Sequence, residues 1–379
     1  MKTIRFGVIG LGLMGREFAS AAARWCHLLD TPARPEIVAI CNRSDGKFDW
    51  YKNAIPTAKQ VTTDYKAVLA NPEVDAVYIA VPHNVHEAMY VDAIKSGKAL
   101  LGEKPFGMDA KQNSAILAAL KANPKVFARC TSQFPFFPAV QEIGKMVTSG
   151  AFGRLLEVNA GFLHSSDLNT KKAINWKRMV EVNGDYGCMG DLGMHVCHFP
   201  FRAGWTPKNV RAVLSKIVTE RPDKDGTLVP CKTWDNATLF CETADAAGNV
   251  FPMTLKTFRI APGETNTWYI EVKGTKACAR FSTKNPRRLE KLVYDGGEQA
   301  WQQIDLGYQS AYPAITGSIF EFGFSDAFQQ MMAAFCHEMS TGTTPTPFAG
   351  CARPEEVALS HRLFTAALKS QAEGCVAAV

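Results

Sequence analysis

The chain has 379 residues, an apolar fraction of 46% and a formal net charge of +6. This length allows about two or three domains, and the apolar content is ordinary for a globular protein with buried cores. The positive charge is small and spread without basic runs. Nucleic-acid and membrane partners are therefore not expected, whereas a small anionic ligand is compatible with this surface.

Eleven cysteines are present, an odd number, and no two have the Cys-x-x-Cys spacing. This pattern argues against a disulfide framework and against a zinc cluster, and reduced thiols in a cytoplasmic protein fit it best. The apolar run near the N-terminus is broken by four glycines and closes on Arg16-Glu17, so a secretion signal is not expected. No stretch approaches the roughly 18 continuous apolar residues of a membrane span.

The first third predicts a nucleotide-binding sheet. A strand at 4–9 runs into Gly10-Leu-Gly12-Leu13-Met14-Gly15, and a helix follows over 17–25. In this context the first glycine makes the tight turn, the second lets a pyrophosphate approach the backbone, and the third lets helix pack on strand. Phosphates then meet the amides of a helix N-terminus. Further strands, separated by helices, indicate a doubly wound parallel sheet and are predicted at 36–41, 76–81, 99–102 and 126–130.

The second strand ends at Asn42-Arg43-Ser44, where this fold normally places an acid on the adenosine ribose. A carboxylate there would repel a 2′-phosphate, but Asn42 repels nothing, and Arg43 could pair with that phosphate or stack on adenine. The pair favours NADP slightly over NAD. Two alternatives stay open, because Asn42 can still hydrogen-bond a ribose and Arg43 can be a solvated surface residue.

Two later loops lie at the carboxyl edge of the sheet, where such folds bind their ligand. The first, Val81-Pro82-His83, leads into a helix that we expect to be capped by Asn84, with His86 in its first turn. The two histidines are more consistent with capping or cofactor contact than with metal binding, because no carboxylate or cysteine completes a site. The second loop, Glu103-Lys104-Pro105, supplies Lys104, the leading catalytic candidate.

The second domain is predicted to be β-rich, with hairpins, an antiparallel sheet and two closing helices at 326–339 and 354–371. One helix interrupts it and carries Asp191, His195 and His198, which share one helical face because of their spacing. A capping aspartate with core histidines explains this face on its own. A dehydrogenase, however, needs a group that takes up a hydroxyl proton, and histidine titrates in the right range. The predicted strands are 155–162, 210–218, 237–243, 250–258, 268–272, 277–281 and 289–293.

In this order and spacing, the glycine loop, Val81-Pro82, Glu103-Lys104-Pro105 and Asp191-x-x-x-His195 resemble the glucose-fructose oxidoreductase and inositol dehydrogenase family. The resemblance implies an N-terminal Rossmann domain at 1–131 and an α+β domain with a large, mostly antiparallel sheet at 132–379. It also implies that Lys104 favours the alkoxide beside the nicotinamide, that His195 is the general acid or base, and that Asp191 binds sugar hydroxyls or orients this histidine. Glu103 would support the cofactor ribose.

For substrate binding, the resemblance points to the loops that carry His164, Trp176 and Lys177, besides Lys104, Asp191 and His195. Packing and loop polarity would explain any one of the three loop residues equally well. The function expected is NAD- or NADP-dependent hydride transfer at a hydroxyl carbon of a sugar, polyol or sugar derivative. The alternative is an NAD-dependent glycoside hydrolase of the same family, which oxidises, eliminates, hydrates and re-reduces with no net cofactor turnover. Similar proteins associate through their C-terminal sheet, so a homodimer or homotetramer is expected.

Overall fold

The computed structural model describes residues 1–307, 310–317 and 320–379, and the chain divides into two compact units. The first comprises Met1–Gly107, Lys111–Phe136 and the described part of Tyr308–Pro354. The second comprises Met108–Ala110, Phe137–Gly307 and Glu355–Val379. The predicted boundary at residue 131 assigns 308–354 to the second domain, whereas the described residues of this segment belong to the first unit.

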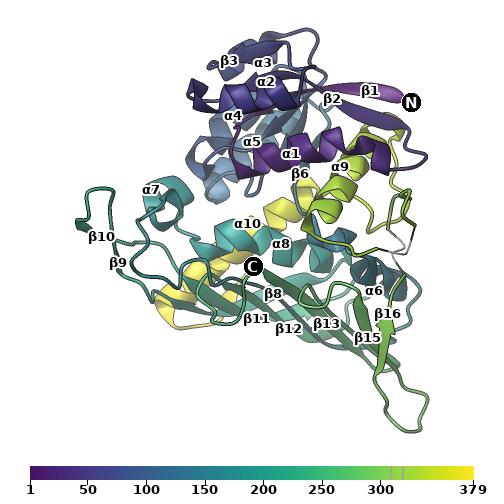
Figure 1. Ribbon diagram of the computed structural model, residues 1–379. Helices are drawn as coiled ribbons and strands as arrows, with labels where there is room; N and C mark the ends of the chain where they lie inside the picture. Colours follow the sequence, from purple (N-terminus) through teal and green to yellow (C-terminus); the bar gives the residue numbers. More distant parts are fainter. Residues whose placement is uncertain (308–309, 318–319) are drawn as a thin grey trace. The chain divides into compact units, whose positions relative to one another are not determined.

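The first unit is built on a six-stranded sheet in the order β3-β2-β1-β4-β5-β6, and every neighbouring pair is parallel (Figure 1). The order reverses at β1, as in a doubly wound dinucleotide-binding fold. Strands β4 and β5 are apolar throughout, and β1 and β2 are apolar in their carboxyl halves, as expected where helices cover both faces of a parallel sheet. The strands are β1 (Lys2–Ile9), β2 (Ala33–Cys41), β3 (Gln60–Thr62), β4 (Ala76–Ile79), β5 (Ala99–Gly102) and β6 (Ala128–Cys130).

Helix α9 (Phe324–Thr341) belongs to this unit because it packs on α1 (Leu13–Ala23) and on β2. The paired side chains of Arg129 and Glu338 also join it to β6. The other helices are α2 (Phe48–Ala54), α3 (Tyr65–Ala70), α4 (His86–Lys95) and α5 (Ala110–Ala122).

The predicted cap of α4 is wrong. Residues His83–Val85 form a 3-10 turn, and the helix begins after Val85 without a side-chain cap, so Asn84 lies before the capping position.

The second unit contains a nine-stranded sheet in the order β16-β15-β14-β13-β7-β12-β11-β8-β17. Only β7 and β12 are parallel, which confirms the mostly antiparallel prediction. A small hairpin is formed by β9 (Glu220–Pro222) and β10 (Leu228–Pro230). The large sheet consists of β7 (Leu155–Leu163), β8 (Thr206–Ser215), β11 (Asn236–Ala244), β12 (Val250–Phe258), β13 (Thr267–Gly274), β14 (Ala277–Ser282), β15 (Arg288–Val293), β16 (Gln302–Asp305) and β17 (Ala377–Ala378).

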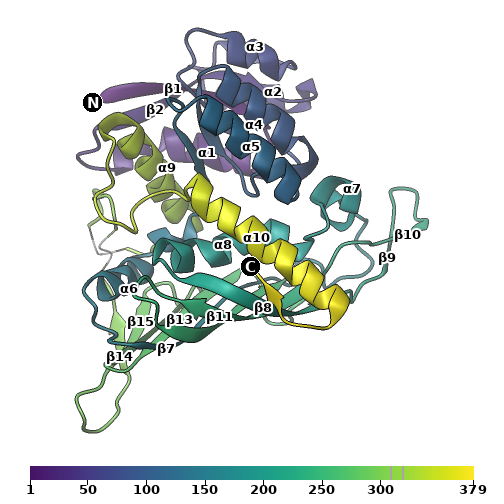
Figure 2. The same ribbon diagram turned by 180° about the vertical axis from the view of Figure 1, so that it is seen from behind.

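Helices cover one face of this sheet (Figures 1 and 2). Helix α8 (Cys188–Arg202) packs on β7, β11 and β12, and α6 (Pro138–Thr148) packs on β14. Helix α10 (Pro354–Glu373) is held at β8, where Ser370 Oγ accepts a hydrogen bond from the Ala212 amide at 2.9 Å. The short α7 (Val180–Asn183) precedes α8. Among the described residues, no helix combines the length and apolarity needed to cross a membrane.

Candidate active site

The glycine loop between β1 and α1 has the geometry of a phosphate-binding turn. Gly10 has a φ of +98°, and a Cβ there would lie 2.1 Å from the Ala80 carbonyl oxygen. A Cβ at Gly15 would lie 2.2 Å from the Gly10 carbonyl oxygen, so the fold itself requires these two glycines. A Cβ at Gly12 would meet no atom within 4 Å. The space beside Gly12, at the start of a helix without a side-chain cap, fits the approach of a dinucleotide pyrophosphate to the backbone.

Asn42 ties the end of β2 to the glycine loop. Its Oδ1 accepts a hydrogen bond from the Leu11 amide at 3.3 Å, and its Nδ2 donates one to the Ser44 carbonyl at 2.8 Å. The side chain therefore shapes the turn that would face an adenosine ribose, a role that the sequence alone does not reveal. Arg43 is exposed, so its guanidinium is accessible to a phosphate.

The Glu103-Lys104-Pro105 segment leaves the carboxyl end of β5. Glu103 is only 7% exposed, and its Oε1 accepts a hydrogen bond from the Tyr78 hydroxyl at 2.7 Å. Burial and the nearby Glu103 charge raise the pKa of Tyr78 well above its ordinary value, so this phenol remains a donor. Lys104 is half-buried, while Pro105 after it is buried. The segment thus presents an ammonium group from an anchored backbone.

The two histidines of the preceding loop are both buried. His83 is 3% exposed and His86 is fully buried, and their rings lie 5.4 Å apart. Among the described residues, no group of three or more histidine, cysteine or acidic side chains is arranged to hold a metal ion. The burial of His86 favours a supporting role in the loop over direct contact with a cofactor.

In the second unit, α8 places Asp191 and His195 one turn apart, and both are buried. Helix α8 can approach α10 closely at Gly193, where a Cβ would lie 2.3 Å from the Phe364 ring. Asp191 is not a simple helix cap, because its Oδ2 accepts hydrogen bonds from Lys177 Nζ at 3.0 Å and from Arg259 Nη1. Both cations favour the charged carboxylate, which can accept hydrogen bonds from hydroxyl groups.

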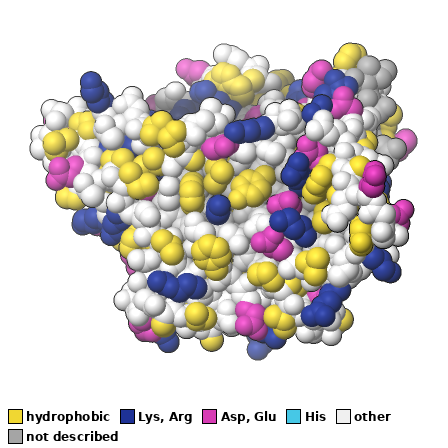
Figure 3. Space-filling view, turned by 90° about the horizontal axis from the view of Figure 1, so that it is seen from below, with side chains coloured by type: hydrophobic (Ala, Val, Ile, Leu, Met, Phe, Trp, Pro, Cys, Tyr) yellow, Lys and Arg dark blue, Asp and Glu magenta, His cyan; other side chains and the backbone are white. Residues whose placement is uncertain are grey.

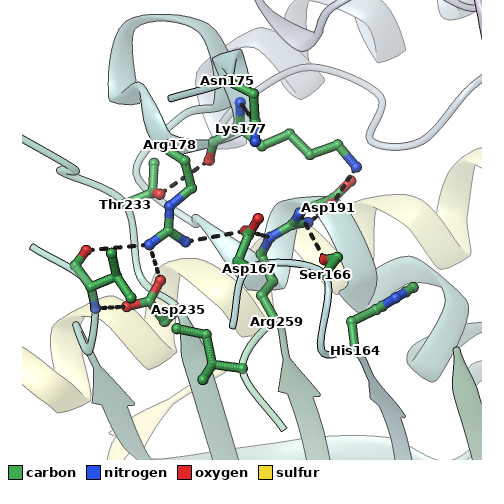
Figure 4. A network of polar contacts seen from close by, with 12 residues as sticks. His164, Ser166, Asp167, Asn175, Lys177, Arg178, Asp191, Thr233, Asp235 and Arg259 are labelled. Atoms are coloured by element: carbon green, nitrogen blue, oxygen red, sulfur yellow. Dashed lines mark hydrogen bonds and ion pairs between the residues drawn. The ribbon is translucent and has the colours of Figure 1, made fainter. Parts of the chain in front are cut away.

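Behind Asp191 lies a buried chain of alternating charges (Figure 4). Arg259 Nε donates to Asp167 Oδ2 at 2.7 Å while its Nη1 reaches Asp191. Arg178 lies 3.5 Å from the same Asp167 oxygen and also pairs with Asp235. Burial, the largest single influence, would raise the pKa of Asp167, but the charge and hydrogen bond of Arg259 act together with the Arg178 and Arg221 charges and lower this pKa below the ordinary value.

With Lys177, this charge network contains three cations and three carboxylates. Its outer end is Lys177, whose side chain is 33% exposed, whereas the side chains of the other five members are at most 6% exposed. Lys177 is therefore the accessible end of the network. The resemblance pointed to the loops that carry Asp167 and Arg178 but gave neither residue a role of its own. Asp235 and Arg259 were not predicted, although Arg259 directly follows strand β12 and is recognisable in the sequence as a charge among core residues.

Aromatic packing joins His164 to His195. The Phe162 ring lies 4.5 Å from His164 and packs edge-on against His195 at 5.5 Å. The His195 carbonyl accepts a hydrogen bond from the Trp268 indole at 2.9 Å, which fixes the backbone of that turn. Burial, together with the Arg259 charge, lowers the pKa of His164 to about 4, so its ring is neutral at pH 7.

Four predicted substrate residues therefore gather in this unit. Figure 4 shows His164, Lys177 and Asp191 at one end of the charge network, and the Trp176 ring lies 5.6 Å from Lys177 Nζ. His195 lies one turn from Asp191 on α8 and contacts the Phe162 ring. Asp191 and Lys177 can hydrogen-bond hydroxyls, while His195 can exchange a proton. The predicted cofactor residues lie in the first unit, along the carboxyl edge of its sheet and on the glycine loop.

Comparison with known proteins agrees with both halves of this description. The family described as "Oxidoreductase family, NAD-binding Rossmann fold" matches residues 4–129, and the "GFO/IDH/MocA C-terminal domain" matches residues 140–280. An uncharacterized oxidoreductase of Synechocystis sp. is 30% identical over 285 residues, which are 74% of each protein. Levoglucosan dehydrogenase of Pseudarthrobacter phenanthrenivorans is 24% identical over 343 residues, covering 85% of this chain and 83% of the relative.

The fold comparison extends over the whole chain. A solved levoglucosan dehydrogenase in complex with NADH and levoglucosan superposes with a TM-score of 0.87 at 21% identity, covering 100% of both chains. The two family matches agree with the strand order of both sheets and with the spacing of the sequence motifs. The chain therefore belongs to the Gfo/Idh/MocA family of oxidoreductases, with an NAD-binding Rossmann fold.

Proposed function

We propose that this protein transfers a hydride between a nicotinamide cofactor and a hydroxyl carbon of a sugar, polyol or sugar derivative. The observation that carries the proposal is the cluster on α8, where a buried, doubly paired Asp191 stands one turn from His195. On one helix, Asp191 can accept a hydrogen bond from a substrate hydroxyl and His195 can accept a proton. The dehydrogenase relative and the unobstructed backbone at Gly12, where no atom lies within 4 Å of an added Cβ, support the same reading.

We assign the proton chemistry to three residues of the chain. His195 takes the hydroxyl proton in the oxidative direction, and the Lys104 ammonium favours the developing alkoxide. Asp191 holds a neighbouring hydroxyl, assisted by Lys177. When bound, the nicotinamide supplies the hydride acceptor or donor. Trp176 and His164 complete the sugar contacts as an apolar wall and a neutral hydrogen-bonding group.

For the cofactor, we assign the pyrophosphate to the backbone of Gly10, Gly12, Leu13, Met14 and Gly15, and the nicotinamide side to the loops around Val81-Pro82-His83 and Glu103. NADP is slightly preferred, since Asn42 adds no negative charge beside the exposed Arg43.

Two variants test the cofactor preference. Asn42→Asp keeps the acceptor for the Leu11 amide, and it should shift affinity from NADP toward NAD. Arg43→Ala should weaken NADP binding by about tenfold or more and leave NAD nearly unchanged. Equal NADP affinity in wild type and Arg43→Ala, measured by nucleotide fluorescence, contradicts the assignment.

The decisive experiment for the reaction is a panel of free sugars, polyols and glycosides with each of NAD and NADP. Net formation of reduced nicotinamide from a free sugar supports the proposal, whereas glycoside cleavage without net cofactor change contradicts it. Lys104→Met and His195→Ala should each lower kcat by about 10²–10⁴. Turnover within about threefold of wild type would show that the roles are misassigned.

We also propose that copies of the chain associate through the uncovered face of the nine-stranded sheet. Figure 3 shows apolar side chains on that side of the molecule, interspersed with both signs of charge. On β8 and β11, Val213 and Phe240 alternate with buried neighbours and are each about half exposed, at 50% and 52%. Light scattering should report a dimer or tetramer, and Phe240→Arg should shift it toward monomer. A monomeric wild-type protein contradicts the proposal.

A further inference from the structure

One face of helix α4 carries two aromatic side chains that the proposed reaction does not use. His86 and Tyr90 are four residues apart, so they lie above one another on the helix. Both are fully buried, and their rings stack with centroids 4.8 Å apart at an angle of 20°. Two polar side chains with no exposed surface need internal hydrogen-bonding partners.

Their partners are the carbonyls on either side of Lys104. The Tyr90 hydroxyl donates to the Glu103 carbonyl at 2.6 Å, and His86 Nδ1 lies 2.7 Å from the Pro105 carbonyl oxygen. The opposite ring nitrogen, Nε2, lies 2.9 Å from the Val81 carbonyl oxygen. One helix face therefore contacts the backbone directly before Lys104, directly after it, and in the loop that follows β4.

Only one of the two contacts of His86 can be a hydrogen bond when the ring is neutral. Carbonyl oxygens only accept, and a neutral imidazole has a single N–H to donate. Burial, together with the Lys104 charge, lowers the pKa of His86 to about 4. The charged group that acts on the ring is the Lys104 ammonium, whereas the Glu103 carboxylate accepts its hydrogen bond from Tyr78. At pH 7 the ring can donate its N–H to only one of the two carbonyls, and we take the Pro105 carbonyl, at the shorter distance, as the acceptor.

We propose that His86 and Tyr90 are positioning residues that aim Lys104, His86 through the Pro105 carbonyl and Tyr90 through the Glu103 carbonyl. The proposal rests on the catalytic role of Lys104 proposed above. A lysine at the end of a strand has four rotatable side-chain bonds, so a fixed backbone narrows the range of positions that its ammonium can reach. A misplacement of about 1 Å can cost on the order of 10² in rate.

Four variants test this inference in the full-length protein. His86→Phe keeps an aromatic ring for stacking and removes both nitrogens, while Tyr90→Phe removes only the hydroxyl. His86→Asn puts an amide donor near the position of Nδ1, and His86→Gln puts one near Nε2. Tyr65→Phe is the matched control, because the Tyr65 hydroxyl donates to Asp92 of the same helix at 2.7 Å, away from the Lys104 segment.

We expect His86→Phe and Tyr90→Phe to lower kcat by about 10- to 100-fold. The affinity for NADH, followed by fluorescence, should change by less than about threefold in both variants, since binding and alignment are separate contributions. His86→Asn should recover kcat to within about threefold of wild type and His86→Gln should not. Independently of activity, amide hydrogen exchange in a peptide covering 101–107 should become faster in His86→Phe and Tyr90→Phe, but not in Tyr65→Phe.

A double variant separates positioning from general support of the fold. If His86 acts through Lys104, adding His86→Phe to Lys104→Met should cause little further loss in single-turnover rate. A full, additive loss would overturn the inference, as would unchanged kcat and unchanged exchange in both aromatic variants. Failure of the proposed function looks different: Lys104→Met would then retain turnover, while the exchange of 101–107 would still report whether His86 and Tyr90 hold the segment.

Discussion

Removing Arg259 tests the buried charge network directly. Its guanidinium lies between Asp167 and Asp191, whose side chains are each 1% exposed. In Arg259→Met the side chain keeps a similar length but the two carboxylates lose their shared cation, and the network changes from three cations and three anions to two and three. Leaving a buried charge without its partner costs about 3–5 kcal/mol, so the free energy of unfolding should fall by that amount.

The assay is urea unfolding at pH 7, with Lys273→Met as the matched control. Lys273 lies on β13 of the nine-stranded sheet, and its Nζ pairs with Glu157 at 2.7 Å. The side chains of both residues are more than a third exposed, at 39% and 36%. An exposed pair contributes about 0–1 kcal/mol, so this variant should unfold almost as the wild type does. Added salt should weaken the exposed pair and leave the buried network nearly unchanged.

A compensating variant sharpens the test. Adding Asp167→Asn to Arg259→Met restores equal numbers, two cations and two carboxylates, and part of the lost stability should return while Asp191 keeps its pairing with Lys177. If Arg259→Met cost no more than Lys273→Met, the guanidinium would not hold the two carboxylates, and the description of Asp191 as a fixed hydroxyl acceptor would fail with it.

Further predictions concern the glycine loop and pH. Gly12→Ala should leave the urea midpoint unchanged, because no atom lies within 4 Å of its added Cβ, yet weaken NAD(H) binding by about tenfold or more; Gly46→Ala, equally open, is the control, and equal affinities in the two would contradict the assignment. Gly10→Ala should lower the midpoint itself, given its positive φ and the Ala80 contact. The pKa of His86 is about 4 in the folded protein and 6.5 in the unfolded chain. Between these two pH values only the unfolded chain binds a proton at this residue. Stability should therefore fall on acidification, by up to about 1.4 kcal/mol per pH unit, and His86→Phe should show a shallower slope in urea midpoints between pH 7 and 5.

Most strands and loops of the first unit could be predicted from the sequence, because each depends on residues close together in the chain. The glycine loop, the apolar strands and the turn at Asn42 are each specified within a few residues, and the five predicted strands overlap β1, β2, β4, β5 and β6, while the short edge strand β3 was not predicted. The cap of α4 was misjudged for a local reason too, since Asn84 lies inside a 3-10 turn that residue type alone does not distinguish from a helix start.

By itself, the sequence determined the two kinds of sheet and the candidate chemistry of Lys104, Asp191 and His195. These follow from periodicity and from side-chain type, which a chain carries before it folds. The tertiary structure alone decided that Arg259 stands between Asp167 and Asp191, residues 92 and 68 positions away in the chain. It also decided that α4 contacts both carbonyls beside Lys104, because such contacts depend on how separate elements pack against each other.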